Sequence, residues 1–345
     1  MHRFPAGLEV CKEKQGKLKE KKDIFGKIRY DELMKSEEME VLQMSDKKGR
    51  PKRGISFYSY ENLLGRTMTL EDAFREVYDT GATCFEFLTS YIENYPNPSP
   101  QWVDKFWGLC AKYNLEPAEL GHWAENHLHR GPGMTDDEVV EELKQDFRLA
   151  NLLGFKTLRT KITCVNEICD PEPGWQTYIE KALPYAEKYD VRMQNEVHLP
   201  TTLHTPHIRD EYLDFIHRTG TKHFGFNIDF GTFQTKHAKG MEHMNWLTFE
   251  DVSKPEEIVE FLPYCWSCHT KFTNVDENFE ETTIPYREVI GLMVDNGWSG
   301  HLLSEYEGPL RFNAEQSPEN FGRAMDGIPD QVRRHQIMMR NILGY

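Results

Sequence analysis

The sequence contains no apolar run near 18 residues, the length at which a helix can cross a membrane. It also lacks a basic surplus, because 41 Lys and Arg are outnumbered by 56 Asp and Glu, which gives a net charge of −15. Proteins that bind the nucleic-acid backbone need a basic face, so we expect no nucleic-acid partner. The N-terminus lacks the apolar core and cleavage site of a signal peptide, and the seven cysteines follow no regular framework. These absences favour a cytoplasmic protein with reduced thiols and no membrane contact.

The N-terminal residues 1–52 differ in composition from the rest of the chain. They are highly charged and nearly free of core-forming periodicity, although a short helix over 31–44 is plausible. Such a segment is either a solvated, disordered arm or an arm that becomes ordered against a partner subunit. We expect residues 53–345 to form the catalytic domain, because α/β barrels often reach this length as one domain.

Strand-like runs recur about every 35 residues from Arg53 onward, with helical stretches between them. Two of these helical stretches, 70–81 and 136–154, end at a glycine that suits a helix C-cap. Eight strand–helix repeats predict a (β/α)₈ barrel, since an open doubly wound sheet would need a G-x-G-x-x-G loop that is absent. The segment Thr232–Leu262 is a long insertion after the sixth strand, where it can shape the pocket. The eight runs are 53–60, 82–90, 115–123, 155–163, 191–198, 223–231, 264–272 and 300–308.

Acidic residues and a histidine fall near the C-terminal ends of the last four runs. Alternate residues of a barrel strand point inward, and barrel active sites lie at this end. Glu196, Asp229, His269 and Glu305 should therefore meet in one mouth. Three clustered carboxylates repel one another unless they share a cation. Three carboxylates and one imidazole suit Mn²⁺ best, with Mg²⁺ or Co²⁺ as alternatives.

The order Glu, Asp, His, Glu on successive strands resembles the xylose-isomerase-like barrel superfamily of sugar isomerases and epimerases. Two features depart from its epimerases: Thr232 stands where many have a histidine in D-x-x-H, and His198 follows Glu196 in an E-x-H pattern. With the charged arm and the insertion, these features are more similar to the large subunit of bacterial C-glycoside deglycosidases. That resemblance implies a metal-dependent lyase that acts on 3-oxo-C-glucosides of phenols, paired with a small β-rich subunit.

The chemistry expected of such a site is enolate formation. A metal ion can bind a ketone oxygen and stabilise the enolate that forms when the neighbouring C–H is deprotonated. We predict His198 as the base, because its strand also carries a ligand and it faces the same way. Lys161 and Lys271 are predicted to polarise or orient the substrate, although each could simply balance the carboxylates.

Substrate contacts are predicted at two places. Glu307 faces the same way as Glu305 on the last strand. The loop after the third strand, on the catalytic side, contributes further candidates, for which a solvated or packing role is the alternative. These candidates are His122, Trp123, His127 and His129.

Residues 265–269 match the haem-attachment pattern C-x-x-C-H, but we reject this reading. Residues three apart on a strand face opposite sides, so we expect the thiols of Cys265 and Cys268 to diverge. Two functions compete with the lyase: a ketose epimerase or isomerase that acts alone, and a metal-free structural subunit. An abasic-site nuclease shares the barrel but needs more ligands and a basic groove, which the charge disfavours.

Overall fold

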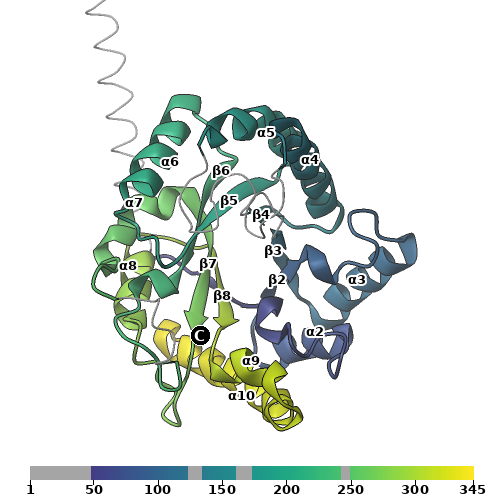
Figure 1. The fold of residues 1–345 in the computed structure, drawn as a ribbon, viewed down its shortest axis with the longest axis vertical. Coiled ribbons are helices and arrows are strands. Elements are labelled where there is room, and N and C mark those ends of the chain that lie inside the picture. Colours follow the sequence, from purple (N-terminus) through teal and green to yellow (C-terminus); the bar gives the residue numbers. More distant parts are fainter. Residues whose placement is uncertain (1–47, 123–133, 161–172, 242–248) are drawn as a thin grey trace, which may run out of the picture.

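The computed structural model describes residues 48–122, 134–160, 173–241 and 249–345. Within them, eight parallel strands pair in sequence order and close into a barrel, with β8 bonded back to β1. Figure 1 shows the helices as a ring around the strands. The predicted (β/α)₈ barrel is therefore confirmed. The predicted arm and helix within residues 1–47 lie outside the described residues, and the division at residue 52 stays a prediction.

All eight predicted runs contain a strand. The strands are β1 Lys52–Ser56, β2 Cys84–Leu88, β3 Glu116–His122, β4 Thr157–Thr160, β5 Arg192–Val197, β6 Phe224–Asp229, β7 Cys265–Phe272 and β8 His301–Tyr306. The helices are α2 Leu70–Asp79, α3 Pro100–Tyr113, α4 Asp136–Leu152, α5 Trp175–Tyr189, α6 Pro206–Thr219, α7 Ile258–Phe261, α8 Tyr286–Asp295, α9 Pro309–Asn313 and α10 Pro318–Leu343.

Side-chain caps and glycines set the ends of the two predicted helices. α2 begins after a capping box at Thr69, and α4 begins after one at Thr135. Gly81 and Gly154, with φ of 72° and 82°, follow them in the left-handed region that glycine tolerates best. The first run is shorter as a strand than its sequence suggested. It turns into a 3₁₀-helix, η1 (Phe57–Tyr60), because the Ser56 hydroxyl caps its start.

Strand β7 contains a bulge that corrects one expectation. Phe226 pairs with Cys265 and Asn227 with Ser267, so Trp266 is an extra residue in the ladder. The bulge changes the alternation, and the sulfur atoms of Cys265 and Cys268 lie 3.4 Å apart instead of diverging. Both thiols are buried.

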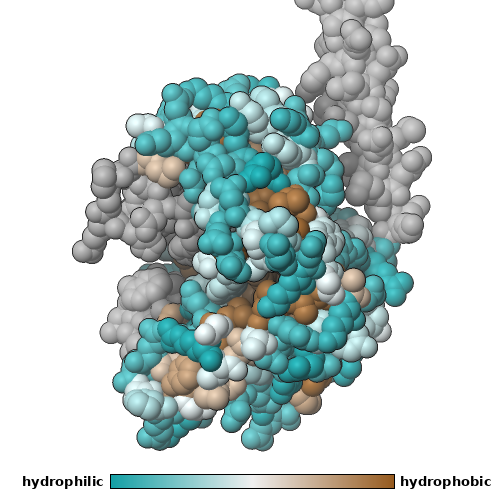
Figure 2. All heavy atoms as spheres, turned by 90° about the vertical axis from the view of Figure 1, so that its right-hand side faces the viewer, coloured by the Kyte–Doolittle hydropathy of each residue, from teal (hydrophilic) through white to brown (hydrophobic). Residues whose placement is uncertain are grey.

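Apolar side chains fill the space between the barrel and its helices. An aromatic group around Phe57, Phe85 and Phe106 joins η1 and β2 to α2 and α3. A second group around Trp175 and Phe224 packs α5 and α6 against β6. The face that includes α3 and α4 is mainly hydrophilic, with small hydrophobic areas (Figure 2). No helix of the described part combines the length and the apolar character needed to cross a membrane.

The inside of the barrel changes from apolar to acidic towards the mouth. Cys84, Ala118 and Leu303 form a small apolar cluster near the start of the strands. Buried polar residues follow, and buried carboxylates lie at the C-terminal ends. The connection from β6 to β7 leaves the mouth through the 3₁₀-helix η3 (Phe230–Phe233) and returns through η4 (Pro255–Glu257), α7 and η5 (Leu262–Tyr264).

Candidate metal centre and active site

The four predicted metal ligands meet inside the barrel mouth. Each of Glu196, Asp229, His269 and Glu305 offers one ligand atom, and these atoms all lie within 4.8 Å of one another. A six-coordinate cation with bonds of about 2.1 Å keeps opposite donors about 4.2 Å apart, so the cluster has the right size. All four residues are buried, which limits competition from bulk water. Oxygen donors with one imidazole fit a hard divalent cation.

Electrostatics in the cluster favour a bound cation. Burial raises the pKa of Asp229 to about 8, and the neighbouring carboxylates of Glu305 and Glu196 add to this effect. Although burial alone would lower it, the same two carboxylates and Glu86 hold the pKa of His269 well above its usual value. The cluster therefore retains protons at neutral pH that a divalent cation would displace.

His269 lies between two groups of carboxylates. Its Nδ1 is 2.9 Å from Glu196 and 3.2 Å from Glu305, on the ligand side. Its Nε2 is 3.2 Å from Glu86 and 3.5 Å from Glu119, which come from β2 and β3. The carboxylates of Glu86 and Glu119 attract a proton to Nε2, which leaves the Nδ1 lone pair for a metal. Neither Glu86 nor Glu119 was among the residues predicted from the sequence.

Arg159 on β4 connects these two groups of carboxylates. Its guanidinium lies 2.8 Å from Glu86, 3.1 Å from Glu196 and 3.6 Å from Glu119, and the side chain is 1% exposed. Burial would raise the pKa of Glu86, but Arg159 and His269 hold it at about 2. Arg159 therefore keeps Glu86 ionised.

Neutral side chains complete the support of Glu119. The Asn227 amide donates to Glu119 over 2.7 Å, and the Gln194 amide and the Ser267 hydroxyl also donate to it. These donors come from β5, β6 and β7, so one carboxylate joins four strands. We infer that this layer fixes the side chains beneath the metal cluster.

Lys271 and Glu307 form an ion pair at the rim of the cluster. The Lys271 ammonium contacts Glu307 and lies 3.9 Å from Asp229. Burial opposes ionisation of Glu307, but Lys271 and Arg311 bring its pKa down to about 2. Gly231 allows the close approach of these groups, since a Cβ there would lie 2.8 Å from Asp229 and 2.9 Å from Lys271.

His198 lies beside this ion pair with a defined tautomer. Its Nδ1 is 2.6 Å from the carbonyl oxygen of Leu199, which can only accept, so Nδ1 carries the proton. When the ring carries a single proton, its lone pair is therefore on Nε2. His198 also contributes to lowering the pKa of Glu307, which places the two groups within electrostatic reach.

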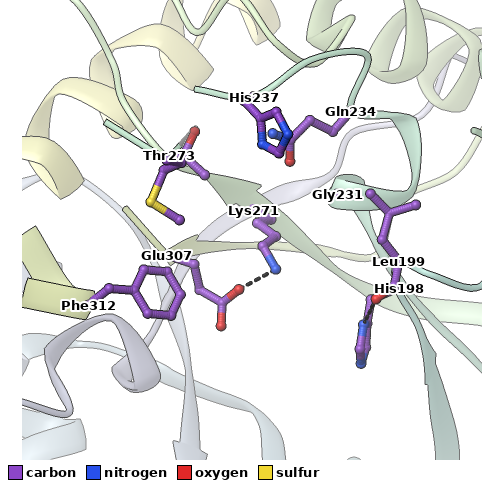
Figure 3. A pocket seen from close by; sticks show the side chains of 10 residues that line it. His198, Leu199, Gly231, Gln234, His237, Lys271, Thr273, Glu307 and Phe312 are labelled. Atoms are coloured by element: carbon purple, nitrogen blue, oxygen red, sulfur yellow. Dashed lines mark hydrogen bonds and ion pairs between the residues drawn. The ribbon is translucent and has the colours of Figure 1, made fainter. Parts of the chain in front are cut away.

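Two adjoining pockets open at the mouth. The inner pocket, of about 70 Å³, is lined by Tyr58, Arg159, Glu196, Asp229 and Glu305. The outer pocket, of about 220 Å³, has Leu199, Gln234, His237, Met241 and Phe312 in its wall. His198, Lys271 and Glu307 belong to both. Figure 3 shows Lys271 reaching towards Glu307 among the side chains of the outer pocket.

Of the remaining residues predicted to contact the substrate, the structure describes only His122. His122 is the last residue of β3 and is buried, and its Nδ1 faces Asp146 of α4 rather than either pocket. The reason is strand alternation, because His122 is three residues from the inward-facing Glu119. The expectation that His122 lies in a mouth loop was wrong. Lys161, Trp123, His127 and His129 lie outside the described residues, so their predicted roles stay predictions.

The comparisons with known proteins agree with this geometry. Residues 74–329 match the profile of the xylose isomerase-like TIM barrel family. The chain belongs to this family. It is 23% identical to the 3'-dehydrocarminate deglycosidase alpha subunit of Microbacterium sp, over 75% of this chain and 88% of that protein. It is 24% identical to a C-glycoside deglycosidase alpha subunit of Arthrobacter globiformis, over 81% and 90% of the two chains.

Solved structures share the fold. D-psicose 3-epimerase from Clostridium cellulolyticum H10 superposes with a TM-score of 0.61 at 16% identity, over 85% of this chain and 99% of that one. The probable 3-DHS dehydratase AsbF of Bacillus anthracis reaches 0.53 at 14% identity, over 84% and 99%. The resemblance seen in the sequence is confirmed at the level of the family and of its relatives.

Proposed function

We propose that this chain is the catalytic subunit of a metal-dependent lyase that cleaves the carbon–carbon glycosidic bond of 3-oxo-C-glucosides. The observation that carries the proposal is His198, whose Nδ1 faces the Leu199 carbonyl so that Nε2 is the atom that can act as a base, in the wall shared by the inner and outer pockets. The names of the relatives, deglycosidase alpha subunits, support the same reaction. The word "alpha" supports a further proposal, that a small β-rich subunit completes the enzyme.

The residues divide the chemistry between them. A divalent cation held by Glu196, Asp229, His269 and Glu305, with Mn²⁺ favoured, would supply Lewis acidity towards the 3-oxo group. His198 takes the C2 proton on Nε2, at the junction of the pockets. Lys271 and Glu307, held as an ion pair on the same wall, orient the sugar by hydrogen bonds.

The bond changes balance within the substrate. As the proton leaves C2, a C1–C2 double bond forms and the bond from C1 to the aglycone carbon breaks. The electron pair of that bond goes to the aglycone carbon, which takes a proton. His198 can return the proton it removed, so no redox partner is needed.

A ketose epimerase is the second candidate, because the four-ligand cluster suits enolate chemistry of either kind. One feature disfavours it. Thr232, at the position of the epimerase histidine, turns its hydroxyl to the Ser253 hydroxyl at 2.7 Å and to the Thr201 carbonyl at 3.3 Å. It therefore brings no titratable group to the cluster. Conversion of a free ketose to its epimer by this chain alone would support this candidate.

Aglycone release tests the proposal directly. The full chain, Mn²⁺, a 3-oxo-C-glucoside and a candidate small subunit are incubated, and free aglycone is measured by chromatography. We expect release that a chelator abolishes and Mn²⁺ restores. Absence of release with a metal-loaded, folded complex would refute the lyase. A chain that binds no Mn²⁺ at all would favour the metal-free structural subunit instead.

Exchange in D₂O tests the role of His198. We expect His198→Gln to lower kcat by about 10²–10⁴-fold, the usual contribution of a general base, and to suppress deuterium incorporation at C2. The matched control is His207→Gln. The His207 side chain lies on α6 and is 66% exposed, so this variant should have the same kcat and C2 exchange as the unmodified chain. Undiminished C2 exchange in His198→Gln would assign the base elsewhere.

A further inference from the structure

The turn between β5 and α6, residues 198–205, begins with the residue that we propose as the base. The backbone carbonyl of His198 accepts from the backbone N–H of Thr201 over 2.9 Å and from the Thr201 hydroxyl over 2.6 Å. The next residue, Leu199, lies beside His198 in the wall of the outer pocket (Figure 3). The place of His198 at the mouth therefore depends on how this turn is held.

Neutral hydrogen bonds tie the turn to the end of the long insertion after β6. The backbone N–H of Leu203 donates to the Ser253 hydroxyl over 2.8 Å. The Thr232 hydroxyl lies 2.7 Å from the Ser253 hydroxyl and donates to the Thr201 carbonyl over 3.3 Å. These four residues are buried, and none of the groups that form the bonds titrates near neutral pH.

His204 adds a charged contact between the same two segments. Its Nδ1 lies 2.9 Å from the Glu257 carboxylate, and its Nε2 lies 3.0 Å from the Asp251 carboxylate. A carboxylate oxygen only accepts, so both ring nitrogens must donate and the ring carries two protons. The same Glu257 oxygen accepts from the backbone N–H of Lys254 over 3.2 Å, which fixes it at the start of η4. We call the contact of His204 with Asp251 and Glu257 the clasp.

The charge of the clasp depends on pH. The hydrogen bond to Glu257 raises the pKa of His204 above its usual value of 6.5, and the bond to Asp251 adds to this effect against the opposing effect of burial. The clasp is therefore complete below pH 6.5 and is lost as the pH rises through the raised pKa. Within the described residues, the other charged or titratable groups on the neighbouring elements are Glu250, Lys254 and Glu256 beside η4, His207, Arg209, Asp210 and Glu211 on α6, and Glu260 on α7.

We propose that His204 is a positioning residue, whose charged clasp holds the turn that carries His198, so that rising pH loosens this side of the mouth. The inference rests on the proposed function only for the role of His198 as the base. The clasp itself depends on contacts that are independent of the reaction. The insertion that the clasp reaches also supplies part of the wall of the outer pocket, so a looser clasp affects that wall as well as the base.

Amide hydrogen exchange tests the clasp without any catalytic step. The full chain is exchanged at about pH 6 and about pH 9, and the peptide that covers residues 199–205 is followed by mass spectrometry, with rates corrected for their intrinsic pH dependence. We expect its protection to fall about 3–10-fold between the two pH values, because two partly exposed ion pairs are lost. In His204→Gln, protection should be equally low at both. The matched control is His207→Gln, since His207 lies on α6 and faces Glu211 at 3.1 Å.

NMR titration of the His204 ring gives a second readout. The signal is assigned as the one that His204→Gln lacks. We expect the ring to titrate above pH 6.5 in the unmodified chain and closer to 6.5 in Glu257→Gln, which removes one carboxylate. Titration of His204 at or below pH 6.5 in the unmodified chain would overturn the inference, and so would equal protection of residues 199–205 at both pH values.

Activity separates the positioning role from the lyase proposal. In the unmodified chain, kcat/KM for aglycone release should fall as His204 loses its proton, and His204→Gln should lack this step. Exchange of residues 199–205 that follows the His204 titration, in a metal-loaded complex that releases no aglycone, would keep the clasp and refute the lyase. Aglycone release with the same pH profile in His204→Gln and His207→Gln would keep the lyase and refute the positioning role.

Discussion

Replacing Arg159 with methionine tests whether the carboxylates inside the barrel depend on their internal cation. Methionine removes the charge but keeps a long side chain, which limits the loss of packing. The guanidinium lies 2.8 Å from Glu86 and 3.1 Å from Glu196, and both partners are buried. Removing one partner of a buried ion pair costs about 3–5 kcal/mol, and hydrogen bonds to charged groups contribute about 1.5–3 kcal/mol each. We therefore expect the free energy of unfolding to fall by about 4 kcal/mol.

Urea unfolding with a metal chelator present at pH 7.5 measures this loss. The midpoint should fall without a change in the slope, which would show that the surface exposed on unfolding is the same. Arg192→Met is the control, since Arg192 is exposed at the start of β5 over the ring of Trp266, and a surface change costs about 0.5 kcal/mol or less. A loss for Arg159→Met within about 1 kcal/mol of the control would refute the reasoning.

A divalent cation provides an independent check of the same idea. Both Arg159 and a bound metal would neutralise Glu196, so the metal should matter more when the guanidinium is gone. Saturating Mn²⁺ should therefore raise the urea midpoint of Arg159→Met by more than that of the unmodified chain. Equal increases would mean that the guanidinium and the metal do not act on shared carboxylates.

Three further changes probe the surroundings of the site. Glu86→Gln should raise the Mn²⁺ dissociation constant about 10–100-fold in calorimetry, because His269 loses the carboxylate that holds its Nε2 proton; unchanged affinity would contradict this. Gly231→Ala should weaken Mn²⁺ binding as well, since the added methyl group lies 2.8 Å from a ligand carboxylate, whereas Gly291→Ala meets nothing within 4 Å and should bind normally. Burial lowers the pKa of His335 to about 3, so the folded state binds fewer protons than the unfolded state between pH 3 and 6.5. Stability is therefore full above pH 6.5 and about 2 kcal/mol lower at pH 5, and urea midpoints of His335→Gln should lack this part of the pH dependence.

The four-ligand cluster could be predicted because strand alternation is a property of the backbone. Glu196, Asp229, His269 and Glu305 each fall near the C-terminal end of a strand, and closure of the barrel brings those ends together. The same alternation, applied to β3, predicts that His122 points outward, because it is three residues from the inward-facing Glu119.

Bulges mark the limit of that rule. Because Trp266 is an extra residue in the ladder, the alternation of faces along β7 is interrupted between Cys265 and Ser267. The thiol of Cys265 therefore lies beside that of Cys268. The local sequence does not predict this bulge, because a bulge is defined by how β7 pairs with β6. The expectation that the thiols diverge was wrong for this reason.

Glu86 and Glu119 could have been found from the sequence. Glu86 is the only carboxylate of its strand-like run, Glu119 shares its run with Glu116 alone, and an unpaired charge inside a barrel is costly. Their partner Arg159 also lies within a strand-like run, but the match between them depends on which strands face each other across the barrel. That arrangement follows from three-dimensional closure, so single-strand patterns could not supply it.

The interior of the barrel explains how the metal cluster can be both acidic and ordered. Carboxylates at the mouth repel one another, and rigid support is needed to hold them at ligand distances. Beneath them, Arg159 supplies positive charge, while Asn227 and Ser267 supply donors to Glu119. A layer of hydrogen bonds that spans several strands resists the outward movement that repulsion would cause. If the proposed metal centre forms, its affinity for a cation should therefore depend also on Glu119 and Arg159, which support the predicted ligands from beneath.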